Sequence, residues 1–243
     1  MVVDYGFDTL PKGMRAVITV GSFDGVHSGH RALLDALVAM SRRKSAESVV
    51  VTFEPHPRIA MGRAEGMKLL TTVEERALLL SRYGVERVIV ARFDDSFRSQ
   101  TYEEFVRMLV DKAGMVGMVV GYNHRFGSNG GGYDNLLPLV EEIGFELQRV
   151  EQFTSEGGKV SSTVVRNLLA EGDIKRATEL MGHGYTIVGD ACDGVVRVED
   201  DNKFVPDEGS YRAMVNGLAE SVVIEGRDIR LTSVVEGRVV IEI

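Results

Sequence analysis

Two histidines separated by two residues, His27 and His30, stand at the end of a glycine-rich stretch. This stretch, Gly21-Ser-Phe-Asp-Gly-Val-His-Ser-Gly-His30, joins the apolar run Ala16–Val20 directly to an amphipathic segment. A helix that starts there directs unpaired N–H groups and the positive end of its dipole at the loop, which favours an anion. Glycines in the loop let a phosphate approach the backbone closely. We therefore predict a phosphate site in which both imidazoles stabilise charge that develops on a phosphorus atom.

Other interpretations of the histidine pair remain open at this point. His30 could be a helix-start residue that faces solvent, or the pair could be half of a zinc site. A zinc site needs further ligands, and the single cysteine, Cys192, lies far along the chain. The stretch lacks the Gly-x-x-x-x-Gly-Lys-Ser/Thr pattern of the P-loop and the Gly-x-Gly-x-x-Gly pattern of dinucleotide sites. The glycine-rich turn after a strand favours the phosphate interpretation.

The elements that position this loop follow from the hydrophobic pattern. Apolar, β-branched runs predict strands at Ala16–Val20, Ser48–Phe53, Val88–Ala91, Met118–Gly121 and Phe145–Val150. Helical periodicity occupies His30–Lys44, Val73–Tyr83, Tyr102–Lys112, Leu136–Ile143, Ser162–Glu171 and Asp173–Met181. Parallel strands need a crossover, which is usually a helix. The alternation therefore predicts an α/β fold with a doubly wound parallel sheet.

The hydrophobic pattern of the sequence changes after Tyr185. Short alternating runs separated by glycine and charge follow, with no helical stretch between them. We place a boundary near Gly184, which divides the chain into an α/β domain at 1–184 and a small all-β, barrel-like domain at 185–243.

Five motifs in order along the chain resemble the bacterial FAD synthetase family, the FMN adenylyltransferase module that is usually fused to a riboflavin kinase. The first is the glycine-rich stretch, whose His-x-Gly-His is similar to that of nucleotidyltransferases. The others are Thr52-Phe-Glu-Pro-His-Pro-Arg58, Leu70-Thr-Thr72, Gly121-Tyr-Asn-His-Arg-Phe-Gly127 and Val160-Ser-Ser-Thr-Val-Val-Arg166. The resemblance covers roughly residues 15–185.

This resemblance implies roles for individual residues. The residues implied to be catalytic are His27, His30 and Arg166. Those implied to bind the nucleotide are Gly21, Phe23, Asp24, Gly29, Ser161, Ser162 and Thr163. Those implied to bind the flavin or its phosphate are Phe53, His56 and Asn123. Taken alone, His56 could be a capped loop histidine, Ser161 an ordinary N-cap beside a surface arginine, and Phe53 a core residue.

The chain departs from the family at two places. His124 stands where the family usually has an aromatic residue, which affects substrate affinity rather than the reaction. The family's C-terminal kinase barrel carries a Pro-Thr-Ala-Asn motif for metal and ATP, and this motif occurs nowhere in the chain. A kinase must hold its γ-phosphate and magnesium in register. We therefore expect a shortened, degenerate kinase-like barrel with a structural or docking role.

Composition excludes several classes of protein. Asp and Glu outnumber Lys and Arg by 36 to 28, and the net charge of −8 disfavours a general nucleic-acid binder. No apolar stretch is long enough to cross a bilayer, and no secretory signal is visible. A single cysteine permits neither an intramolecular disulfide nor a multi-thiolate metal site. We expect a soluble, cytoplasmic protein.

The resemblance thus implies an enzyme that joins FMN and ATP to give FAD and pyrophosphate, with Mg²⁺ accompanying ATP and without riboflavin kinase activity. The sequence assigns no metal ligand, no oligomeric state and no acceptor preference beyond a flavin phosphate. Two alternatives remain: adenylyl transfer to a different phosphate monoester, and a non-catalytic protein that binds flavin or nucleotide.

Overall fold

The computed structural model describes residues 1–151, 154–155 and 158–243. The chain forms two compact units, each built from segments that are separated in the sequence. The first unit contains residues 1–23, 30–65 and 79–153, and the second contains residues 24–29, 66–78 and 154–243. No helix among the described residues combines the length and apolarity needed to span a bilayer.

The first unit is built on a six-stranded sheet in the order β1-β4-β3-β2-β5-β6. Its strands are β1 (Val2–Tyr5), β2 (Ala16–Val20), β3 (Glu47–Glu54), β4 (Arg87–Arg92), β5 (Met115–Gly121) and β6 (Glu146–Val150). Every neighbouring pair is parallel. All residues of β2 are buried, as expected for a strand covered on both faces. The predicted parallel α/β sheet is confirmed, and β1 is an edge strand that the hydrophobic pattern did not predict.

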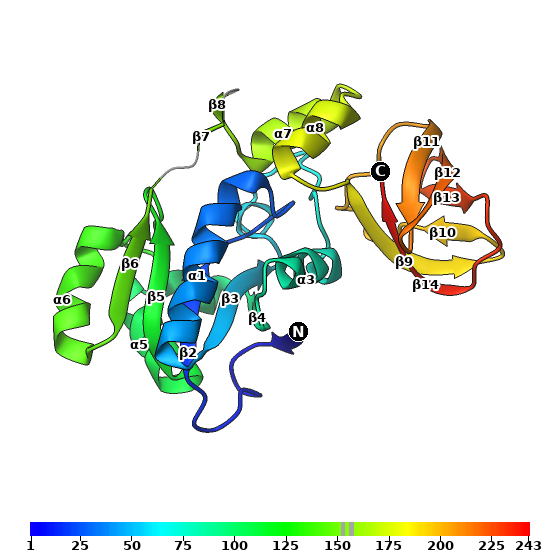
Figure 1. Cartoon of the computed structure of the whole chain (residues 1–243). Coiled ribbons are helices and arrows are strands. Elements are labelled where there is room, and N and C mark those ends of the chain that lie inside the picture. The colour runs from blue at the N-terminus through cyan, green and yellow to red at the C-terminus, as the bar shows by residue number, and fades with distance from the viewer. Residues whose placement is uncertain (152–153, 156–157) are drawn as a thin grey trace. The chain divides into compact units, whose positions relative to one another are not determined.

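Helices cover both faces of this sheet (Figure 1). They are α1 (Arg31–Lys44), α2 (Pro57–Ala60), α3 (Val73–Arg82), α4 (Asp95–Ser99), α5 (Tyr102–Ala113) and α6 (Tyr133–Ile143), and the first part of α3 belongs to the second unit. Phe105 and Leu109 of α5 and Leu136 of α6 share an apolar cluster with Ile18 of β2. The helix α1 packs on β2, β3 and β5 from the other face.

The strand order reverses beside β2, because β3 and β4 lie on one side of it and β5 and β6 on the other. In open α/β sheets, ligands bind outside the carboxyl ends of the strands at such a reversal. Gly21 follows β2 there, and Tyr122 follows β5. The topology therefore indicates a ligand site at the loops that begin at these two residues.

The second unit contains a closed antiparallel barrel in the order β10-β13-β12-β11-β14-β9 (Figure 1). Its strands are β9 (Thr186–Cys192), β10 (Val195–Arg197), β11 (Gly209–Val215), β12 (Leu218–Glu225), β13 (Asp228–Leu231) and β14 (Gly237–Glu242). Buried apolar side chains fill the barrel, among them Ile187, Val196, Val222, Ile229 and Val239.

The same unit includes two helices, α7 (Ser162–Ala170) and α8 (Ile174–Met181), and a short hairpin, β7 (Thr154–Ser155) with β8 (Gly158–Lys159). Between the helices, Gly172 has a positive φ of 78° and the Asp173 carboxylate caps α8 by accepting from the Arg176 amide. The barrel begins at Thr186, and the second unit also takes in residues 24–29 and 66–78. The boundary near Gly184 stays a prediction.

Candidate active site

The loop after β2 has a strained backbone. Phe23, Gly25 and Val26 have positive φ angles of 46°, 80° and 39°. This region costs little for glycine, but a bulky or β-branched residue adopts it only where the surroundings impose it. A Cβ atom at position 25 would also lie 2.7 Å from Cδ1 of Leu70. The loop is therefore held in its conformation by contacts with other segments.

Asp24 supplies most of these contacts within the second unit. Its carboxylate is buried, at 2% exposed, and Oδ1 accepts hydrogen bonds from the Leu70 amide at 2.8 Å, the Thr71 amide at 3.0 Å and the Thr71 hydroxyl at 3.2 Å. Its Oδ2 accepts from Nη2 of Arg166 at 2.8 Å. Both oxygens are thus engaged by the protein itself, so Asp24 can organise the loop and orient an arginine.

Arg166 lies on α7 and is held at two points. Besides its bond to Asp24, its Nε donates to the Lys68 carbonyl at 2.6 Å. Its side chain is 13% exposed, and these two bonds use two of the five guanidinium N–H groups. The guanidinium is therefore fixed in a plane from which it can fork onto phosphate oxygens.

The residues at the start of α7 have separate roles. Ser161 caps the helix, with its hydroxyl accepting from the Val164 amide, which confirms the N-cap. Arg166 is not the surface arginine of that alternative, because its side chain is largely buried. Ser162 donates from its hydroxyl to the Asp24 carbonyl at 2.7 Å, whereas Thr163 is exposed. The nucleotide-binding roles of these three residues stay predictions.

His27 is buried, at 6% exposed, and burial lowers its pKa to about 4, while the charge of Asp24 opposes that shift. The imidazole is therefore neutral at pH 7 and can donate from only one ring nitrogen. A Cβ atom at position 29 would lie 3.0 Å from the His27 Nδ1, so Gly29 leaves room for the ring. His183 contacts the same loop, with its Nε2 3.0 Å from the Gly25 carbonyl oxygen.

His30 belongs to the first unit and immediately precedes α1. Its ring packs against that of Phe23, with 4.9 Å between the ring centroids. Phe23 is buried, and a Cβ atom at position 21 would lie 3.0 Å from its Cε2. Gly21 thus leaves room for the Phe23 ring, and Phe23 packs against His30. The predicted contacts of Gly21 and Phe23 with the nucleotide stay predictions.

A cavity of about 660 Å³ opens in the first unit at the carboxyl ends of β2 and β3, beside the loop that follows β5. Five phenylalanines line it, together with three arginines: Phe53, Phe93, Phe97, Phe105, Phe126, Arg63, Arg98 and Arg125. Gln100 and His124 also line it, and the buried Oε1 of Gln100 and Nε2 of His124 have no hydrogen-bond partner within the described ranges. Burial lowers the pKa of His124 to about 4. The cavity combines a flat apolar lining with polar atoms that a ligand could satisfy.

The other two residues that the sequence assigns to the flavin or its phosphate lie outside this lining. His56 is buried and caps α2, with its Nδ1 accepting from the Arg58 amide at 3.2 Å. Asn123 is exposed and borders a separate pocket of about 230 Å³, together with Tyr133 and Arg149. Of the three, Phe53 alone is brought to the aromatic cavity.

No cluster of three or more His, Cys, Asp or Glu side chains suited to a metal ion occurs in the part of the chain that the structure describes. Sequence reasoning did not assign Leu70, Thr71 and His183 to the site. The sequence does mark Leu70 and Thr71, because Leu70-Thr-Thr72 is one of the five family motifs. His183 follows a helix and carries no motif of its own.

Comparison with known proteins identifies the family of the chain. The family model described as FAD synthetase matches residues 11–164. The chain belongs to the FAD synthetase family. The bifunctional riboflavin kinase/FMN adenylyltransferase of Escherichia coli K12 is 33% identical over 216 residues, which cover 84% of this chain and 69% of that protein. The Listeria monocytogenes protein of the same description is 30% identical over 73% of this chain and 57% of its own length.

A further relative of this description, from Bacillus subtilis, is 28% identical over 84% of this chain and 69% of its own length. Among solved structures, a macrolide-efflux protein from Streptococcus pneumoniae has a TM-score of 0.83 and 21% sequence identity, covering all of this chain and 90% of that one. This second likeness concerns the fold alone. Membership of the family confirms the resemblance read from the five motifs and makes the chain a nucleotidyltransferase.

Proposed function

We propose that this protein transfers the adenylyl group of ATP to FMN. A phosphate oxygen of FMN attacks the α-phosphorus of ATP, the bond from the α-phosphorus to the bridging oxygen breaks, and FAD and pyrophosphate form. The observation that carries this proposal is the arginine held on the glycine-rich loop, since the buried Asp24 carboxylate fixes Arg166 at 2.8 Å. A preoriented guanidinium stabilises negative charge on transferring and leaving phosphates.

The nucleotide end of the proposed site uses the loop and α7. Gly21 and Gly29 leave room for the Phe23 and His27 rings. Ser162 and Asp24 hold the loop for the triphosphate. His27, neutral at pH 7, donates a hydrogen bond to a phosphate oxygen without adding a charge. His30 precedes the N-terminus of α1, where an anion is favoured, and it acts on the α-phosphate in the transition state.

The flavin end of the proposed site is the aromatic cavity. Its volume of about 660 Å³ suits a tricyclic ring, and the rings of Phe53, Phe97 and Phe126 offer faces and edges for it. Gln100 and His124 also line the cavity and add an amide and an imidazole to the aromatic rings, groups that can hydrogen-bond a flavin once side chains adjust. His56 and Asn123 remain assigned to the phosphate and flavin by the family resemblance.

Magnesium enters the proposed reaction as part of the substrate, MgATP. This fits the finding that the described residues hold no cluster able to cage a metal ion. Bound to the phosphates, the ion neutralises the leaving pyrophosphate together with Arg166. We further propose a cytoplasmic location, because the one cysteine and the two intracellular substrates suit a reducing compartment.

We also propose that the protein does not phosphorylate riboflavin. The Pro-Thr-Ala-Asn motif is absent from the sequence, and buried Ile187, Val196 and Val239 are among the side chains that fill the barrel. Such an interior leaves no room for a nucleotide within it.

One experiment tests both proposals. The protein is incubated with MgATP and either FMN or riboflavin, and flavin products are separated by chromatography. FAD and pyrophosphate are expected from FMN, and neither FMN nor FAD from riboflavin. FMN formed from riboflavin at a rate similar to FAD formation contradicts the loss of kinase activity. If neither substrate yields product while ATP binds, the protein is a nucleotide-binding member that lacks catalysis.

A further inference from the structure

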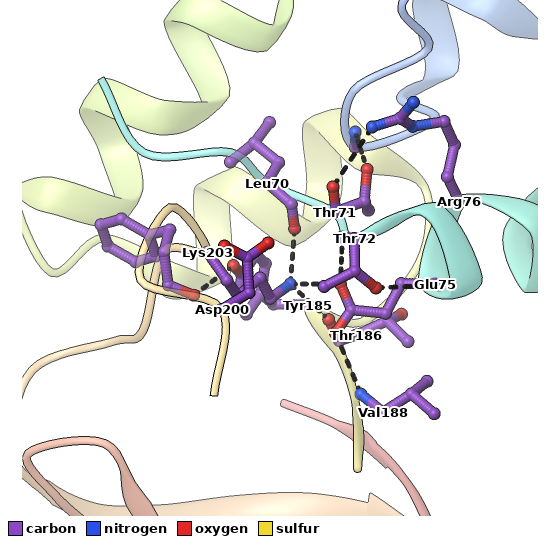
Figure 2. Close-up of polar contacts among 12 residues, drawn as sticks. Leu70, Thr71, Thr72, Glu75, Arg76, Tyr185, Thr186, Val188, Asp200 and Lys203 are labelled. Carbon is purple, nitrogen blue, oxygen red and sulfur yellow. Dashed lines mark hydrogen bonds and ion pairs between the residues drawn. The ribbon is translucent and has the colours of Figure 1, made fainter. Parts of the chain in front are cut away.

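A charged lysine is completely buried in the second unit. Lys203, in the segment between β10 and β11, is 0% exposed, and its ammonium group lies 2.8 Å from the carboxylate of Glu75, itself 1% exposed. The ammonium group also donates to the carbonyls of Leu70 at 2.6 Å and Thr186 at 2.9 Å (Figure 2). The Tyr185 ring lies 4.3 Å away. All three N–H groups of the lysine therefore have acceptors, as a buried charge requires.

The partner carboxylate is equally engaged. Oε2 of Glu75 accepts from the Thr72 amide at 2.7 Å, while the Thr72 hydroxyl accepts from the Glu75 amide, which makes a capping box at the start of α3. Oε1 accepts from the Val188 amide of β9 at 3.0 Å. The pair thus ties barrel strand β9 to the residues that precede and begin α3.

Backbone pairing strengthens the same junction. The Leu69 amide donates to the Asn202 carbonyl at 2.6 Å, and the Phe204 amide donates to the Leu69 carbonyl at 2.8 Å. Lys68 adds a bond from its ammonium group to the Asp201 carbonyl at 2.7 Å. The segment 68–70 is thereby held along its length by the segment 201–204 of the barrel.

One peptide group connects this junction to the glycine-rich loop. The carbonyl of Leu70, which accepts from Lys203, and the N–H of Thr71, which donates to Asp24 at 3.0 Å, belong to the same peptide bond. A positive charge on the oxygen side polarises the peptide and strengthens the N–H as a donor. Asp24 in turn orients Arg166.

We propose that Lys203 is a positioning residue for the nucleotide site, acting through the Leu70–Thr71 peptide on Asp24 and thus on Arg166. The barrel, which has lost the family's kinase motif, serves the adenylyl transfer by holding the loop that receives ATP. This inference rests on the assignment of Asp24 and Arg166 to the nucleotide end of the proposed function.

The test needs a variant that removes Lys203 without leaving the buried Glu75 carboxylate unpaired. Lys203→Met alone leaves the Glu75 carboxylate unpaired, which costs several kcal/mol and threatens folding. The double variant Lys203→Met/Glu75→Gln removes both charges and keeps an amide oxygen as acceptor. The control is Arg197→Met, which breaks the exposed barrel ion pair with Asp228.

Circular dichroism first establishes that the double variant is folded, and calorimetry then measures its affinity for MgATP. We expect the MgATP dissociation constant and the KM for ATP to rise by about 2- to 30-fold, the range found for substitutions that act through connecting contacts. The KM for FMN is expected to stay unchanged, because the flavin is assigned to the first unit. Arg197→Met is expected to match the wild type in all three constants.

A folded double variant that binds MgATP as tightly as the wild type overturns the positioning role. So does an equal rise in both KM values, which indicates a general structural defect. If the wild type binds MgATP but forms no FAD, while the double variant still binds MgATP more weakly, the positioning role holds and the proposed reaction is what fails. Absence of MgATP binding by the wild type overturns both.

Discussion

Arg166 offers the sharpest test of how the site works, because stability and catalysis should respond differently to two substitutions. Arg166→Ala removes the partner of a carboxylate that is 2% exposed. Removing one member of a buried ion pair costs about 3–5 kcal/mol. Asp24 keeps its bonds from Leu70 and Thr71, so we expect the lower end, about 3 kcal/mol of unfolding free energy.

Arg166→Lys keeps the positive charge but loses the planar guanidinium, which can donate two parallel hydrogen bonds. The ammonium group can pair with Asp24, but it gives up the second bond, from Nε to the Lys68 carbonyl at 2.6 Å. One such hydrogen bond contributes about 1 kcal/mol to stability. A point charge does not replace a planar guanidinium on phosphate, so we expect kcat for FAD formation to fall by about 100-fold or more.

The assay combines denaturant unfolding with chromatographic measurement of FAD formation. Arg107→Lys is the matched control, since Arg107 makes an exposed bidentate pair with Glu142 and has no part in the proposed site. It should leave kcat unchanged. Wild-type activity in Arg166→Lys, or a loss of activity in proportion to the unfolded fraction, would refute the argument.

Three other results are expected. His30→Ala should lower kcat far more than it raises the KM for ATP in steady-state kinetics, because the ring acts mainly on the five-coordinate phosphorus; an effect confined to ATP binding contradicts this. Burial lowers the pKa of His124 to about 4 in the folded protein, whereas the ordinary value is 6.5. Between these pH values the unfolded state binds one more proton than the folded state. The free energy of unfolding therefore falls as the pH drops from 6.5 to 4. His124→Phe should flatten that fall by up to about 1.4 kcal/mol per pH unit in denaturant titrations, and an unchanged slope contradicts the assignment. Deleting residues 186–243 should destabilise or aggregate the protein, measured by thermal unfolding and light scattering, because Leu70 and Val165 share an apolar cluster with the barrel; a stable monomer contradicts this.

The elements that position the site follow from local pattern. The β-branched runs of β2 to β5 and the periodic apolar faces of α1 and α5 are long enough to identify. The edge strand β1 was missed because Val2, Val3 and Tyr5 are exposed and carry no buried pattern. The strand β10, of three residues, is too short to show an alternating pattern.

The contacts that orient side chains could not be predicted in the same way. The sequence indicates that Asp24 is a ligand-binding loop residue. Its hydrogen bond to Arg166 could not be predicted, because the two residues are 142 positions apart along the chain. Lys203 and Glu75 each look like surface charges, because their pairing depends on how distant segments meet. Residue types and motifs indicated the chemistry, whereas the hydrogen-bond partners depend on tertiary structure.

The segments of the second unit are synthesised at different times, which affects when the glycine-rich loop can become ordered during translation. The glycine-rich loop leaves the ribosome early, but its partners Arg166 and His183 come 142 residues after Asp24 and 158 residues after Gly25. At about 5–20 residues per second, the loop waits roughly 7–32 seconds for them. Leu70 and Thr71, which also hold Asp24, follow it after only 46 and 47 residues. Nascent chains that end before α7 therefore have part of the support for the loop but lack Arg166. Under the proposed function, Arg166 can act on phosphate only after α7 has been translated.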